Sequence, residues 1–129
     1  MKIVLIRHGA TAGNIKKRYI GITDEDLCAS GIESIHNNIK AGYYQGVQAV
    51  YVSPMKRCRQ TAELIYPEYK QHIVPDFREC DFGIFEGKNY KELSGNEQYQ
   101  RLTVMQRYHF HKEKMLRILR KEVLRAGMI

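Results

Sequence analysis

The sequence is short of several residue types, and each shortage excludes a class of protein. Only 3 prolines occur among 129 residues and 43% of the residues are hydrophobic, which excludes disordered and fibrous proteins. Cysteine is equally scarce: Cys28, Cys58 and Cys80 form an odd set that cannot pair completely, which favours a reducing compartment. The length is that of one domain with a modest core.

Long apolar runs are also missing. The N-terminal stretch Ile3–Ile6 is followed at once by Arg7 and His8. This stretch is too short for the apolar region of a signal peptide or for a membrane span. We therefore expect a cytoplasmic protein without a membrane partner.

Acidic residues are few relative to basic ones. The chain has 14 Asp and Glu against 21 Lys and Arg, and the net charge of +7 by itself favours an anionic partner such as nucleic acid. Residues 1–100, however, hold 13 basic and 12 acidic side chains, whereas residues 101–129 hold 8 and 2. The excess belongs to the last segment, and we expect no nucleic-acid partner.

Short apolar runs alternate with helix-period segments in the first part of the chain. Residues 2–6, 47–52 and 72–74 are predicted to be strands, the first of them buried. A helix-period segment precedes each of the last two. This alternation predicts an α/β protein with a mostly parallel sheet flanked by helices.

Both predicted helices carry N-terminal signals. Ser30 and Glu33 have capping-box spacing at the start of the first helix. Ser53 and Pro54 are typical of the N-cap and the first turn of the second helix, which Pro67 is expected to end.

Polar residues follow each predicted strand, and ligands bind beyond the carboxyl ends of the strands in such sheets. Arginine forks bind phosphate oxygens, and helix amides add donors. Neutral imidazole can attack phosphorus, and a carboxylic acid can protonate the departing alkoxide. The set therefore favours a phosphate monoester as ligand. Its members are Arg7, His8, Gly9, Thr11 and Asn14, then Ser53, Pro54 and Arg57, then Arg78, Glu79, Asp81, Gly83, Glu86 and Gly87.

Taken singly, these are ordinary surface charges and a hydrogen-bonded histidine. Their order along the chain resembles the histidine phosphatase superfamily, in its phosphoglycerate-mutase-like branch, over residues 1 to about 100. The matching stretches are residues 6–14 (IRHGATAGN), 19–27 (YIGITDEDL), Gly31, 52–62 (VSPMKRCRQTA) and 78–88 (RECDFGIFEGK).

The resemblance implies a three-layer α/β fold of the phosphoglycerate-mutase type and chemistry through phosphohistidine. Ala10 stands where the family usually has Glu. No metal or other cofactor is implied, and no spacing of His and Cys suggests a metal site. The implied site residues are His8 as nucleophile, Arg7 and Arg57 as phosphate clamp, Glu79 as general acid, and Asn14 and Gly21 lining the phosphate site.

The expected function is that of a phosphomonoesterase whose ligand is a small phosphorylated metabolite or inorganic phosphate. Residues 82–88 are most similar to small-molecule phosphatases, which makes α-ribazole 5'-phosphate a candidate substrate. Three alternatives stay open: a phosphate-binding remnant without turnover, a phosphotransferase of the phosphoglycerate-mutase type, and a protein that binds through a basic tail.

The resemblance ends near Gln100. We expect an incomplete histidine-phosphatase-like domain over 1–100, truncated at its C-terminal end, and a basic, amphipathic helical tail over 101–129. The family's second active-site histidine is missing, since no strand precedes His109 or His111. Read in another frame from His109, the tail can contain the family's Pro-x-Gly-Glu and Phe-x-x-Arg, so out-of-frame translation is our hypothesis. A missing strand leaves a sheet edge open, and we expect a weakened fold or a homo-oligomer formed through that edge or the tail.

Overall fold

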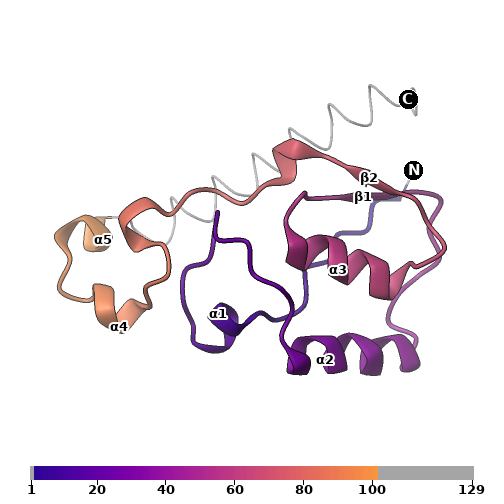
Figure 1. The fold of residues 1–129 in the computed structure, drawn as a ribbon, viewed down its shortest axis with the longest axis horizontal. Coiled ribbons are helices and arrows are strands. Elements are labelled where there is room, and N and C mark those ends of the chain that lie inside the picture. Colours follow the sequence, from indigo (N-terminus) through magenta and orange to yellow (C-terminus); the bar gives the residue numbers. More distant parts are fainter. Residues whose placement is uncertain (1, 102–129) are drawn as a thin grey trace. The chain divides into compact units, whose positions relative to one another are not determined.

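The computed structural model describes residues 2–101, and the chain divides into two compact units, 1–89 and 90–129. The predicted division at residue 100 stays a prediction, and the predicted tail helix, His109 and His111 lie outside the described residues. No helix within residues 2–101 is long and apolar enough to cross a bilayer. The elements are α1 (Ala12–Ile15), α2 (Ala29–Lys40), β1 (Val50–Val52), α3 (Lys56–Ile65), β2 (Gln71–Ile73), η1 (Pro75–Phe77) and η2 (Gly83–Phe85) in the first unit, and α4 (Tyr90–Leu93) and α5 (Glu97–Arg101) in the second (Figure 1).

Strands β1 and β2 pair in parallel and are joined by helix α3. The register places Val50 opposite Gln71 and Val52 opposite Ile73, and the Val74 amide continues the ladder by donating to the Val52 carbonyl at 2.9 Å. Parallel strands joined through a helix form a βαβ unit. The predicted α/β class is therefore confirmed, although the second predicted strand is confined to its last three residues.

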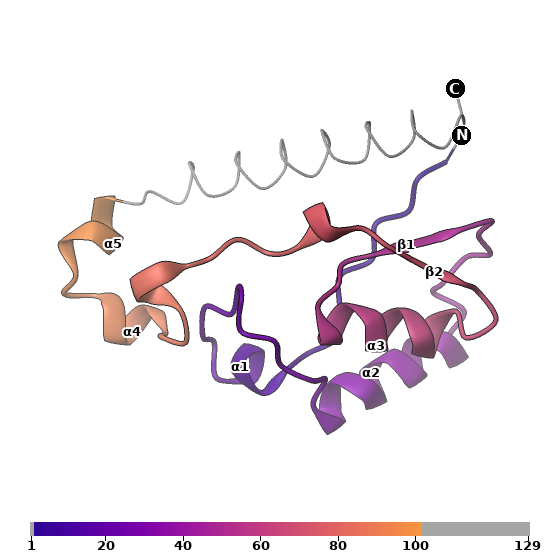
Figure 2. The same ribbon diagram turned by 45° about the horizontal axis from the view of Figure 1, so that its top comes forward.

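Helix α3 lies between the strand pair and α2 (Figures 1 and 2). The buried apolar side chains of this unit come from all three elements and from the loops between them. Ile35 of α2, Val52 of β1 and Ala62 of α3 are buried, and Leu27 and Val74 join them from the flanking loops. This small core packs against the C-terminal end of β1 and the N-terminal end of α3, where the predicted site residues Ser53, Pro54 and Arg57 lie.

The predicted first strand is wrong. Residues 2–6 form no strand, and Ile3, Leu5 and Ile6 are 49%, 62% and 39% exposed. Apolar residues favour a strand only where a neighbouring strand accepts their backbone hydrogen bonds. Within residues 2–101 the only ladder joins β1 and β2, so this run has no such neighbour.

The predicted capping box at Ser30 is also wrong. Helix α2 begins at Ala29, with Cys28 as N-cap and no side-chain cap, so Ser30 lies inside the first turn. The loop before it fixes this start, because the Cys28 amide donates to the Ala10 carbonyl at 3.0 Å and the Leu27 amide donates to Gln60 Oε1 at 2.8 Å. Tertiary hydrogen bonds thus set the helix boundary.

Helix α3 likewise begins later than predicted, at Lys56, with Met55 as N-cap. Ser53 instead forms a turn before the helix, in which its hydroxyl accepts from the Met55 amide at 3.4 Å. The Lys56 amide donates to Asp24 Oδ1 at 2.8 Å, so a distant carboxylate caps the helix. The Lys56 amide is therefore used inside the protein and is not available to a phosphate.

Gly31 lets the loop after His8 lie directly on α2. A Cβ at Gly31 would stand 2.3 Å from the Ala10 carbonyl oxygen, and that oxygen also accepts from Cys28. The Ala10 carbonyl cannot move away without losing this hydrogen bond.

Gly31→Ala is therefore expected to destabilise the protein by about 2 kcal/mol, the cost of overpacking. The same exchange in an ordinary helix interior stabilises by about 1 kcal/mol. Urea unfolding measures the difference. Gly46→Ala is the control, since nothing lies within 4 Å of its Cβ position. An unchanged or higher midpoint for Gly31→Ala contradicts the prediction.

Candidate functional site

His8 lies half-buried in the loop between the N-terminal run and α1. Its Nδ1 is 2.7 Å from the carbonyl oxygen of Gly9, so Nδ1 carries the proton and donates to that oxygen. The tautomer this contact selects leaves the lone pair on Nε2. A neutral ring with a free Nε2 lone pair is a nucleophile.

Burial and the neighbouring guanidiniums favour the neutral form of the His8 ring. Burial is the largest cause that lowers the pKa of His8, and the guanidiniums of Arg57 and Arg7 lower it further. The Gly9 carbonyl and the Glu79 carboxylate raise it, but the net pKa lies below the usual 6.5. The charges of Arg57, Arg7 and Glu79, the other three side chains predicted to perform the chemistry, thus all act on the His8 ring.

Thr61 of α3 fixes the His8 loop to the helix. Its hydroxyl accepts from the Gly9 amide at 3.0 Å and donates to the Arg57 carbonyl at 2.7 Å. One side chain therefore sets the position of the backbone beside His8 relative to the turn that carries Arg57.

Arg57 is 2% exposed, although it was expected from the sequence alone to be an ordinary surface charge unless it served a site. Its Nη1 donates to the Thr23 carbonyl at 2.9 Å and its Nη2 to the Gly21 carbonyl at 3.0 Å. Guanidinium has five N–H donors, so three remain for an anion. Both of these partners are neutral carbonyls, so neither offsets the positive charge of the guanidinium.

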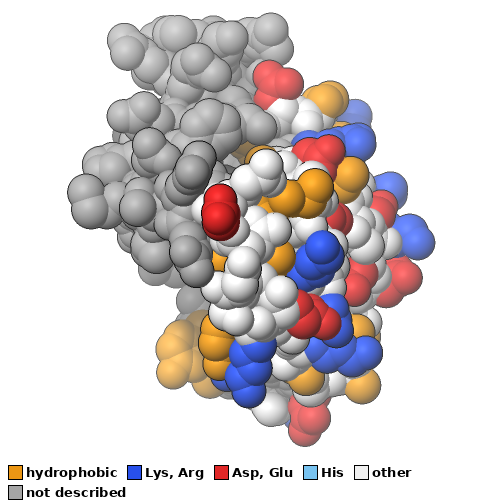
Figure 3. All heavy atoms as spheres, turned by 90° about the vertical axis from the view of Figure 1, so that its left-hand side faces the viewer, with side chains coloured by type: hydrophobic (Ala, Val, Ile, Leu, Met, Phe, Trp, Pro, Cys, Tyr) orange, Lys and Arg blue, Asp and Glu red, His pale blue; other side chains and the backbone are white. Residues whose placement is uncertain are grey.

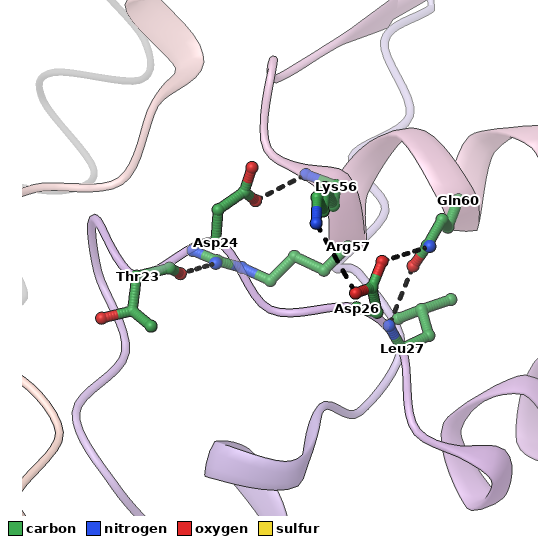
Figure 4. A network of polar contacts seen from close by, with 7 residues as sticks. All are labelled: Thr23, Asp24, Asp26, Leu27, Lys56, Arg57 and Gln60. Carbon is green, nitrogen blue, oxygen red and sulfur yellow. Dashed lines mark hydrogen bonds and ion pairs between the residues drawn. The ribbon is translucent and has the colours of Figure 1, made fainter.

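The loop that holds Arg57 is itself tied to α3 by acidic side chains (Figure 4). Asp24 caps the helix, and Asp26 accepts from Gln60 Nε2 at 2.8 Å and lies 3.7 Å from Lys56 Nζ. Gln60 also accepts from the Leu27 amide. Figure 4 shows Arg57 extending from α3 toward Thr23, beside the helix terminus that Asp24 caps.

Asn14 and Gly21, the two residues predicted to line the phosphate site, both have structural partners. Asn14 Oδ1 accepts from the Thr11 amide at 3.1 Å, and the Asn14 amide donates to Thr11 Oγ1 at 3.3 Å, which completes a capping box of α1. The Gly21 amide donates to Glu86 Oε1 at 2.8 Å, and its carbonyl accepts from Arg57. Gly21 therefore contributes through Arg57 and offers no free amide.

Glu79 and Arg7 complete the predicted set. Glu79 is half-buried, and its Oε1 accepts from the amide of Cys80 at 2.8 Å. Its charge also reaches the thiol of Cys58, whose pKa is raised first by burial and then by Glu79, against the lowering effect of Arg57. Arg7 is exposed.

Sequence reasoning assigned no role to Thr61, and it placed Glu86 only among the polar residues that follow the third predicted strand. Thr61 stands four residues after Arg57, which places both on one side of α3, and this spacing was the signal available for it. Glu86 accepts from the amides of Gly21, Thr23 and Phe82, which come from two segments far apart in the chain. No local spacing reveals that contact.

The coloured part of the face in Figure 3 carries acidic and basic side chains interspersed with hydrophobic ones. They do not gather into a basic patch on that part of the surface. Nucleic-acid sites are continuous basic stripes. The interspersed charges accord with the near balance of acidic and basic residues in positions 1–100.

A family model described as the histidine phosphatase superfamily (branch 1) matches residues 3–124. The chain is similar to the adenosylcobalamin/alpha-ribazole phosphatase of Escherichia coli, with 32% identity over 95 residues that make up 72% of this chain and 47% of that protein. It is also similar to a probable phosphoglycerate mutase GpmB of Enterobacter sp., with 28% identity over 107 residues, 81% of this chain and 50% of that protein. The chain spans about half the length of these relatives.

Solved structures show the same relationship. A phosphoserine phosphatase of Entamoeba histolytica, in complex with 3-phosphoglyceric acid, matches with a TM-score of 0.66 and 30% identity over 73% of this chain and 47% of that one. A putative alpha-ribazole-5'-P phosphatase of Escherichia coli matches with a TM-score of 0.62 and 29% identity over 74% and 49%. The predicted phosphoglycerate-mutase-like fold is thereby confirmed. The family match continues to residue 124 and so runs against the expectation that the resemblance ends near Gln100. The division into an incomplete domain and a tail stays a prediction.

Proposed function

Because the chain belongs to the histidine phosphatase superfamily, we propose that it is a phosphomonoesterase acting on a small phosphorylated metabolite through a phosphohistidine at His8. The observation that carries the proposal is the environment of the His8 ring. Its Nδ1 is engaged by the Gly9 carbonyl, and the charges of Arg57, Arg7 and Glu79 act on it.

In the first step, Nε2 of His8 attacks phosphorus while the ester P–O bond breaks. Arg57 and Arg7 bind the non-bridging oxygens, whose negative charge their guanidiniums offset. Glu79, in its protonated form, gives its proton to the departing alkoxide. The products are an alcohol and phosphohistidine.

In the second step, water attacks the phosphorus of phosphohistidine and the N–P bond breaks. Glu79, now a carboxylate, takes the proton that the water loses. Inorganic phosphate leaves, and His8 regains its lone pair on Nε2. The Gly9 carbonyl holds the Nδ1 proton throughout, so the ring does not need to turn between the two steps.

Hydrolysis of p-nitrophenyl phosphate tests this proposal directly. The chain is expected to release p-nitrophenol together with one equivalent of inorganic phosphate. A rate equal to that of buffer alone, with retained binding of phosphate or vanadate, would instead support a phosphate-binding remnant. Absence of both turnover and anion binding overturns both functions.

With p-nitrophenyl phosphate, whose acidic leaving group departs without a proton from Glu79, the pH dependence of kcat/KM reports the protonation of His8. Protonation blocks the nucleophile, so the rate rises with pH as the ring loses its proton. Burial and the nearby guanidiniums lower the pKa of His8, so we expect the midpoint of this rise below pH 6.5. A pH–rate profile with p-nitrophenyl phosphate checks this, and a midpoint above 6.5 contradicts it.

The names of the relatives favour a second candidate. Several are probable phosphoglycerate mutases, in which an acceptor hydroxyl would take the place of water in the second step. Incubation with 3-phosphoglycerate distinguishes the two: free phosphate indicates the phosphatase, and an isomeric phosphoglycerate indicates the phosphotransferase.

For the phosphatase, α-ribazole 5'-phosphate is the substrate that we propose to test first, since two similar proteins are named for it. We propose the cytoplasm as location, because the three cysteines are free thiols.

A further inference from the structure

Glu86 accepts hydrogen bonds from amides of two separate segments. Oε1 accepts from the Gly21 amide at 2.8 Å and from the Thr23 amide at 3.0 Å, and Oε2 accepts from the Phe82 amide at 3.3 Å. A carboxylate offers acceptor lone pairs on both of its oxygens and has no proton to place, which suits three amide donors. The contacts therefore favour the carboxylate form of Glu86.

The carbonyls of the same two residues, Gly21 and Thr23, hold the guanidinium of Arg57 at 3.0 and 2.9 Å. Each of these residues thus has its amide on Glu86 and its carbonyl on Arg57. The amide and the carbonyl of one residue are joined through its Cα by two soft dihedral angles, so a shift of the amides displaces the carbonyls to the extent that the loop is held elsewhere.

The loop has little freedom to compensate. A Cβ at Gly21 would stand 2.0 Å from the Cys80 carbonyl oxygen, so the loop lies directly against the segment that carries Glu79. A second tie joins the same regions, because the Tyr19 amide donates to the Lys88 carbonyl and the Gly87 amide to the Tyr19 carbonyl, at 2.9 and 2.8 Å.

We propose that Glu86 is a positioning residue that aims Arg57 at the phosphoryl group, acting through the 21–23 loop. The proposal rests on the proposed function, since it assigns to Arg57 the role of binding phosphate. Glu86 does not touch the substrate. It fixes the positions of the two carbonyls that accept hydrogen bonds from Arg57. These carbonyls in turn set the direction of the three remaining N–H donors of the guanidinium.

The protonation of Glu86 accords with this role. Burial raises the pKa of Glu86, but the hydrogen bonds from Thr23, Gly21 and Phe82 outweigh burial and bring the pKa below its usual range. The carboxylate therefore stays charged at the pH at which a phosphatase works.

The test compares Glu86→Ala with the wild type and with Glu68→Ala, which removes an exposed carboxylate outside the site. In the absence of any anion, Glu86→Ala is expected to speed hydrogen exchange at the Gly21 and Thr23 amides and to broaden or shift the Nε–H signal of Arg57 in NMR spectra. Orthovanadate affinity is expected to fall roughly tenfold or more, as misplaced groups lose productive geometry. Glu68→Ala changes none of these.

The dependence on Arg57 is tested in a double-mutant cycle. In an Arg57→Ala background, Glu86→Ala is expected to weaken vanadate binding less than about twofold, since the group it positions is gone. An equal loss in both backgrounds, or an unchanged Arg57 signal, overturns the proposal. Should Glu86→Ala unfold, Glu86→Gln, which keeps the size and one acceptor oxygen, supplies the same comparison.

The two proposals fail in different ways. A wild-type chain that binds no vanadate overturns the proposed function of the site. The exchange rates and the Arg57 signal then still decide whether Glu86 holds the loop and the guanidinium, because neither measurement needs an anion.

Discussion

Replacing His8 with alanine is expected to reduce the turnover of p-nitrophenyl phosphate by at least about three orders of magnitude, because removal of an attacking group leaves only binding and electrostatic effects. The variant should remain folded. The His8 side chain is half-buried, and its one hydrogen bond goes to the adjacent Gly9 carbonyl, which solvent can replace. Steady-state kinetics and a circular dichroism spectrum measure both properties.

The matched control is His36→Ala, which removes an exposed imidazole from α2 and should leave the rate unchanged. Trapping provides a second readout. Brief incubation of the wild type with ³²P-labelled substrate should label the protein at His8 in a bond that acid cleaves, and His8→Ala should take up no label. Equal rates for His8→Ala and the wild type would show that the turnover does not pass through His8.

The sequence predicts which residues form the candidate site, but it does not predict the contacts that hold them. His8, Arg7, Arg57 and Glu79 stand in recognisable motifs, and the charges of the last three act on the pKa of His8. The burial of Arg57 was not predicted, since a lone arginine is usually exposed. The sequence does not predict that Arg57 donates to the Gly21 and Thr23 carbonyls, because those partners lie more than thirty residues away along the chain.

The predicted starts of the two helices were wrong for the same physical reason. Ser30 and Ser53 are good local caps, but Cys28 and Lys56 already have longer-range partners in Ala10 and Asp24. A tertiary hydrogen bond to a fixed carbonyl or carboxylate outweighs a local preference of about 1 kcal/mol.

The predicted first strand was wrong for a different reason. Local composition predicts that Ile3–Ile6 is apolar enough to be buried, but the run needs a hydrogen-bonded neighbour before it becomes a strand. The β1–β2 ladder, by contrast, lies in a βαβ unit whose helix supplies both the connection and the core. The fold could thus be predicted where two strands that pair with each other flank one packed helix in the sequence.

Arg57→Ala is expected to lower both the stability of the chain and its affinity for phosphate. The Gly21 and Thr23 carbonyls lose a charged donor in a buried place, which we expect to cost about 3 kcal/mol in the free energy of unfolding. Phosphate or vanadate affinity should fall by at least about a hundredfold, because the loss removes charge-assisted donors aimed at the anion. Urea unfolding and calorimetric titration measure the two effects.

The neighbouring arginine is the control for charge. Arg59 lies two residues further along α3 but is exposed. Arg59→Ala therefore removes the same charge from the same helix without removing a buried side chain. It should change stability by less than about 0.5 kcal/mol. Equal losses of affinity in both variants would mean that net charge, and not the position of Arg57, attracts the anion.

Arg57→Lys separates the two roles of the guanidinium. Lysine keeps the charge but offers one point of attachment, so it cannot hold the Gly21 and Thr23 carbonyls in the same geometry and also bind two phosphate oxygens. We expect most of the affinity to be lost while part of the stability returns. A lysine variant with wild-type affinity would show that the fork geometry is not needed, and that the loop does not aim Arg57.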